Sequence, residues 1–85
     1  MLVPGHEVAV LVSALRAHGE RVAALTLFAT VEDAVAMPRD AGAYAERLYA
    51  TMWELDGASD VVVVEEPPEG DAWEAVRDRL RRAAS

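Results

Sequence analysis

The stretch Asp60-Val61-Val62-Val63-Val64-Glu65 decides the fold of this 85-residue chain. Four consecutive β-branched residues favour a strand over a helix. Because polar residues do not alternate with the valines, both faces of the strand should be covered, as in the centre of a parallel sheet. Pro67 and Pro68 end the strand, since proline cannot donate a hydrogen bond to a neighbouring strand.

Three other segments are predicted to be strands of the same sheet. Leu2 and Val3, followed by Pro4-Gly5, form a short strand with its turn. Residues 22–29 are apolar almost throughout, which indicates a second buried strand. Residues 34–37 are a short strand candidate that stops at Pro38.

The segments between and after these strands have the apolar spacing of helices. From about His6 to the stop at Gly19, apolar residues recur with spacings of three and four: Val8, Leu11, Val12 and Leu15. The longest helix should cover residues 41–56, with Asp40 as its N-cap. A last helix to about residue 84, capped by Asp71, has the apolar stripe Trp73, Val76, Leu80 and Ala83.

Alternating strands and helices predict an α/β fold with right-handed crossovers. We expect one small Rossmann-like three-layer domain over residues 1–85, with a mostly parallel four-stranded sheet and three helices. A core of this size gives modest stability unless a partner adds burial.

Composition excludes several classes of function. The net charge of −7 would repel nucleic-acid phosphates, so direct nucleic-acid binding is not expected. No cysteine is present, which excludes disulfides and cysteine-based metal sites. His6 and His18 flank one helix and cannot share a metal through it. Without a signal-like start or a membrane-length apolar stretch, we expect a cytoplasmic protein that makes no membrane contact.

Two later segments resemble a known family. Residues 44–56 read Tyr-Ala-Glu-Arg-Leu-Tyr-Ala-Thr-Met-Trp-Glu-Leu-Asp, and residues 78–84 read Asp-Arg-Leu-Arg-Arg-Ala-Ala. Together with the intervening valine strand and its Glu-Pro end, they resemble the C-terminal domain of long-form threonylcarbamoyl-AMP synthases, of the Sua–YciO–YrdC family. In that family the first helix reads A-x-x-L-Y-x-x-L-R-x-L-D and the last carries D-R-L-x-x-A-A.

The resemblance implies an accessory domain of an enzyme that serves the threonylcarbamoyl-adenosine modification of tRNA. The family's chemistry lies in a larger N-terminal domain that binds ATP, threonine and bicarbonate. No catalytic residue matches this chain, so neither catalysis nor a cofactor is expected of it, and a separate catalytic domain is one expected partner. The chain departs from the family at Trp53, where Arg is usual, and at residues 71–73, where Gly-x-Gly is usual.

Acidic residues at the carboxyl edge of the sheet are the candidate ligand site. Glu65 and Glu66 follow the valine strand, at the edge where open α/β sheets bind ligands. This edge could bind a small ligand, with Glu65, Glu66 and Asp71 as candidate residues. A cation site would need a third acid, such as Asp56 or Asp71, to converge on the pair, and one of the two glutamates could act as a general base. The simpler interpretation is a pair of solvated loop acids, with no metal site.

Tyr49 and Trp53 are the candidate interface residues. They lie one turn apart and extend the apolar stripe of their helix beyond what one sheet face needs. Tyr and Trp are enriched at interface hot spots. The sequence therefore predicts a homodimer or a partner-protein interface here. The alternative is that Trp53 folds back and completes the chain's own core.

Overall fold

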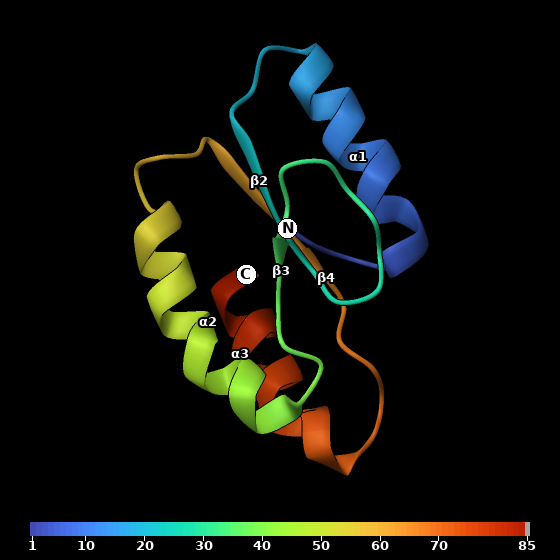
Figure 1. Ribbon diagram of the computed structural model, residues 1–85, viewed down its shortest axis with the longest axis vertical. Coiled ribbons are helices and arrows are strands. Elements are labelled where there is room, and N and C mark those ends of the chain that lie inside the picture. The colour runs from blue at the N-terminus through green and yellow to red at the C-terminus, as the bar shows by residue number, and fades with distance from the viewer. Residues whose placement is uncertain (85) are drawn as a thin grey trace.

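The computed structural model describes residues 1–84, which form a four-stranded parallel sheet and three α-helices (Figure 1). The strands are β1 (Leu2–Val3), β2 (Val22–Thr26), β3 (Val35–Ala36) and β4 (Val61–Glu65). The helices are α1 (Gly5–Ala17), α2 (Ala41–Leu55) and α3 (Glu74–Ala84), the last preceded by a 3-10 turn, η1 (Asp71–Trp73). This arrangement confirms the predicted Rossmann-like α/β fold.

The valine strand β4 occupies the interior of the sheet, whose order is β1-β4-β2-β3. On one side, Val61 to Val64 pair with Val22 to Leu25 of β2. On the other, Val64 and Glu65 pair with Leu2 and Val3. Both edge strands have only two residues, so little unpaired backbone is offered to another chain.

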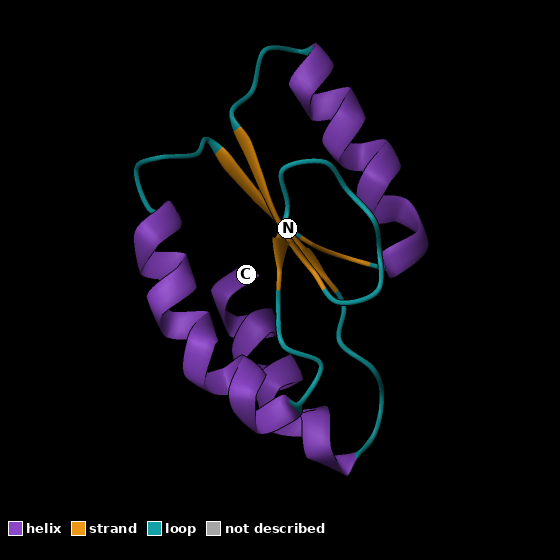
Figure 2. Ribbon diagram, viewed as in Figure 1, coloured by secondary structure: helices purple, strands orange, loops and turns teal. Residues whose placement is uncertain are grey.

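Helices cover both faces of the sheet, with α1 on one side and α2 and α3 on the other (Figure 2). Val63 is fully buried against Val8 and Val12 of α1. The adjacent Val64 packs with Tyr44 of α2 and Leu80 of α3 on the opposite face. Successive strand side chains point to opposite faces, which explains why the valine run is not interrupted by polar residues.

Strand β2 is shorter than predicted. It ends at Thr26, whereas the apolar run predicted a strand to residue 29. The amides of Leu27, Phe28 and Ala29 leave the sheet and donate hydrogen bonds to the side chain of Glu65. The apolar pattern therefore continued past the point where tertiary hydrogen bonds ended the strand.

The two predicted helix caps have different outcomes. The side chain of Asp40 accepts a hydrogen bond from the Ala43 amide at 2.9 Å, which confirms it as the N-cap of α2. The prediction that Asp71 caps the last helix is wrong, because Asp71 lies inside η1 and Gly70 occupies the N-cap position. Gly70 has φ of 125°, a conformation that favours glycine and starts the turn before Asp71 can cap it.

Candidate functional site

The loop after β2 surrounds the carboxylate of Glu65 at the carboxyl edge of the sheet. Oε1 accepts hydrogen bonds from the amides of Leu27 at 2.8 Å, Phe28 at 3.1 Å and Ala29 at 2.9 Å. Oε2 accepts a second contact from Phe28 at 3.2 Å. Successive amides that converge on one anion form a nest, which compensates the cost of burying the charge. We call the Leu27–Ala29 amides and the Glu65 carboxylate the amide nest.

The Glu65 carboxylate of the amide nest is buried. Glu65 is only 4% exposed, and a Cβ atom at Gly5 would lie 3.0 Å from Oε2. The start of α1 therefore passes directly against the carboxylate, and glycine permits this approach. The structure places Glu65 inside the protein, where it positions a loop.

Tyr44 lies close enough to the amide nest for the charge of Glu65 to affect it. Among the described residues, its buried hydroxyl has no hydrogen-bond partner. Burial, and secondarily the negative charge of Glu65, raise the pKa of Tyr44 to about 12. Tyr44 is thus a neutral phenol at physiological pH, and its ring packs edge-on against Trp73 at 5.5 Å.

Phe28 and Arg39 cover the outside of the loop. The Nε atom of Arg39 donates a hydrogen bond to the Leu27 carbonyl at 2.9 Å, and its guanidinium lies 4.7 Å from the centre of the Phe28 ring. Phe28 is 58% exposed. Neither residue could be predicted from the sequence, since neither belongs to a motif and only the bend after Thr26 brings them together.

The other two candidate acids remain on the surface. Glu66 and Asp71 are exposed, in contrast to Glu65. Within residues 1–84, no three histidine or acidic side chains are grouped so that they could hold a metal. The carboxyl edge therefore does not unite Glu65, Glu66 and Asp71 into a metal site.

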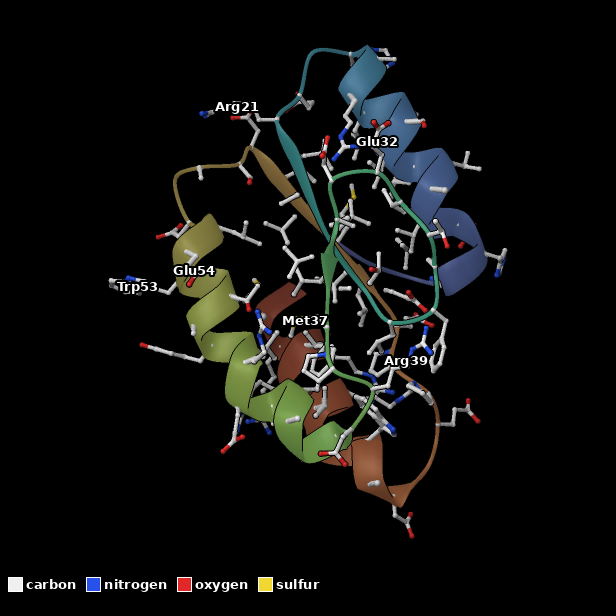
Figure 3. The ribbon with its side chains drawn as sticks, in the orientation of Figure 1. Arg21, Glu32, Met37, Arg39, Trp53 and Glu54 are labelled. Atoms are coloured by element: carbon white, nitrogen blue, oxygen red, sulfur yellow. The ribbon has the colours of Figure 1, made fainter. Side chains whose placement is uncertain are left out.

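The candidate interface residues lie on the outer face of α2. Tyr49 is 76% exposed and Trp53 is 73% exposed. Figure 3 shows Trp53 projecting away from the body of the molecule. The alternative in which Trp53 completes the chain's own core is therefore wrong, because the helix buries Tyr44, Leu48 and Thr51 instead.

Comparison with known proteins agrees with the resemblance seen in the sequence. None of the curated proteins and none of the solved structures matches the chain. The family described as threonylcarbamoyl-AMP synthase, C-terminal domain, matches residues 2–85. Among residues 1–84, no helix has the length and apolar character needed to cross a membrane. Since the match covers nearly the whole sequence, the chain belongs to the threonylcarbamoyl-AMP synthase C-terminal domain family.

Proposed function

We propose that this domain is a non-catalytic accessory part of threonylcarbamoyl-AMP synthesis and acts through contacts with other proteins. The family match over residues 2–85 supports the assignment. In this family the chemistry belongs to a different domain, which binds ATP, threonine and bicarbonate. The partner would be such a catalytic domain, on the same polypeptide or on a separate one, in the cytoplasm.

The observation that carries this proposal is the amide nest. Open α/β sheets bind ligands at the carboxyl edge, where loop amides can hold an anion. Here three such amides already hold the chain's own Glu65 carboxylate. ATP and bicarbonate are anions, and the net charge of −7 disfavours their approach further. A domain with this edge filled is better suited to contact another protein than to bind those substrates.

The burial of Glu65 argues against the two alternative functions, a small-ligand site and an enzyme with a glutamate as general base. The small-ligand site relied on an accessible sheet edge near Glu65, and the general base was to be Glu65 or Glu66. Glu65 is buried and bonded to backbone amides, so it serves neither role. Glu66 is an exposed acid, and it does not line the hollow that Asp71 shares with Glu74 and Arg77. We therefore keep the accessory role as the single proposal.

Two measurements test the accessory role. The purified chain, given ATP, threonine and bicarbonate, should release no pyrophosphate above background. A threonylcarbamoyl-AMP synthase catalytic domain prepared without its C-terminal domain should bind the chain in isothermal titration calorimetry. Pyrophosphate release by the chain alone would overturn the non-catalytic part, and absence of binding would overturn the accessory part.

A further inference from the structure

We propose that the outer face of α2 docks a basic protein segment, whose Arg or Lys side chain stacks on Trp53 and Tyr49 and pairs with the carboxylates around them. This inference rests on the proposed function, because it names the surface and the partner chemistry for an accessory domain that acts through protein contacts. We call the exposed set Glu46, Tyr49, Ala50, Trp53, Glu54 and Asp56 the aromatic face.

Two neighbouring aromatic rings form the centre of the aromatic face. Tyr49 and Trp53 are one helical turn apart, and about three quarters of each residue is exposed. They border two open hollows together, one with Met52 and Asp56 and the other with Ala50 and Glu54. Two exposed rings beside open hollows leave ring faces available to a planar or cationic group.

Acidic side chains surround the rings. Glu54 and Asp56 each border one of the hollows. Glu46 is exposed and precedes Tyr49 by three residues, a spacing that places the two side chains next to each other on a helix. The only basic residue of α2 is Arg47, which lies six residues before Trp53. At about 100° per residue, Arg47 points about 120° away from Trp53 around the helix, whereas Glu46 points within about 20° of Trp53. Glu54 points within about 20° of Arg47, two turns further along, so Glu46 and Asp56 are the acids on the side of the rings.

This charge distribution selects a basic partner over a second copy. A two-fold contact between aromatic faces would bring Glu46, Glu54 and Asp56 of both copies together, in chains that each carry a net charge of −7. A guanidinium or ammonium group can instead form cation–π contacts with the rings and charge-assisted hydrogen bonds with the carboxylates. The partner is therefore expected to present Arg or Lys to α2.

The first test uses a tetra-arginine peptide with blocked ends as the probe. The affinity of each protein is measured at low salt by isothermal titration calorimetry. In the proteins that keep Trp53, nuclear magnetic resonance shifts of its indole N–H, with Trp73 as the internal reference, show whether the peptide binds at this site. Trp53→Ala and the pair Glu46→Gln/Asp56→Asn should each weaken binding about fivefold or more. All three positions are exposed, so the variants should remain folded.

A matched control separates a specific site from general attraction to an acidic protein. The pair Glu20→Gln/Glu32→Gln removes the same charge from exposed positions outside α2. Peptide binding to this control should change less than about twofold. Equal weakening in both pairs, or no shift of the Trp53 signal, would overturn the proposal. Self-association of the wild type that Trp53→Ala abolishes in sedimentation would also overturn it, in favour of a second copy.

A second test distinguishes failure of this surface from failure of the proposed function. The synthase catalytic domain used above is titrated with the wild type, Trp53→Ala and the Glu20→Gln/Glu32→Gln control. Equal binding of all three would overturn the aromatic face as the docking surface while the accessory role stands. Absence of catalytic-domain binding, with site-specific peptide binding retained, would overturn the accessory role alone.

Discussion

The carboxyl edge of the sheet buries its candidate residue Glu65, whereas the outer face of α2 leaves its candidate residues Tyr49 and Trp53 exposed. At the edge, the chain folds a loop over Glu65 and satisfies its carboxylate with three backbone amides. On α2, nothing in the described chain covers Tyr49 or Trp53. A charged residue is thus buried while two aromatic residues are exposed, the reverse of the usual preference. The difference separates a side chain that stabilises the fold from side chains left for another molecule.

Removing the Glu65 carboxylate should have the largest effect. Glu65→Ala leaves three amides without their acceptor, and each unsatisfied buried donor costs about 1–3 kcal/mol. We expect the free energy of unfolding in urea to fall by about 3 kcal/mol or more. The control Glu66→Ala alters an exposed neighbour and should change it by less than about 0.5 kcal/mol. Equal stability of the two variants would show that the amide nest does not hold the loop.

Acetate should partly restore the Glu65→Ala variant. The amides that lost their carboxylate can donate hydrogen bonds to a small carboxylate in its place, and a ligand that binds only the folded state stabilises it. The melting temperature of Glu65→Ala should rise with acetate concentration, relative to chloride at equal ionic strength. The wild type, whose nest is filled, should show no such difference.

Raising the pH should weaken the fold through Tyr44, near the amide nest. The pKa of Tyr44 is about 12 when folded and about 10 when unfolded, so deprotonation favours the unfolded chain above pH 10. The stabilisation is fully present below pH 10 and is lost as the pH rises to 12, by about 3 kcal/mol. Tyr44→Phe should abolish this part of the pH dependence. It should not destabilise the protein at pH 7, because the hydroxyl makes no hydrogen bond within the described chain. An unchanged alkaline profile in Tyr44→Phe would contradict the burial of the phenol.

Gly5→Ala should have a smaller effect on the same nest. The added Cβ would lie 3.0 Å from Oε2 of Glu65, an oxygen that cannot swing away because amides hold the carboxylate. We expect a loss of about 1 kcal/mol in urea unfolding, since overpacking outweighs the better helix propensity of alanine. The control is Gly42→Ala, at an exposed α2 position where the added Cβ would lie 3.3 Å from Oδ2 of Asp40, an exposed side chain that can adjust. If Gly5→Ala proved as stable as the wild type, the approach of α1 to Glu65 would be looser than described.

Changing Trp53 should have the smallest effect on stability. Trp53→Arg restores the residue usual in the family at a position that is 73% exposed. Surface substitutions of this kind change stability by about 0.5 kcal/mol at most, so the melting temperature should stay within about 3 °C. Differential scanning calorimetry measures this directly. A loss of several degrees would mean that Trp53 packs against the domain after all.

The fold could be predicted because its signals are local. The run of valines in β4 and the helical spacing of Val8 and Val12 indicate buried residues, and each of these patterns spans only a few positions in the sequence. Asp40 caps a helix that begins at the next residue. Errors occurred where local signals competed: the apolar run continued past Thr26, and Gly70 began a turn before Asp71.

The candidate site could be predicted only in part. Tyr49 and Trp53 could be identified because they make the apolar stripe of their helix wider than one sheet face needs. The structure leaves both side chains exposed. Glu65 was placed at the correct edge, but its environment was not foreseen. The amides that bind it come from residues 36 to 38 positions away in the sequence, in a segment whose pattern indicated a strand.

The sequence by itself determined the strand and helix order, the interior place of β4 and the family, because each rests on periodicity or on motifs within one segment. Only the tertiary structure decided that Glu65 is buried and Trp53 is exposed. The physical reason is that a carboxylate can be buried only when distant donors converge on it. An aromatic ring stays exposed only when no other part of the chain covers it. Neither condition can be predicted from the residues adjacent in the sequence.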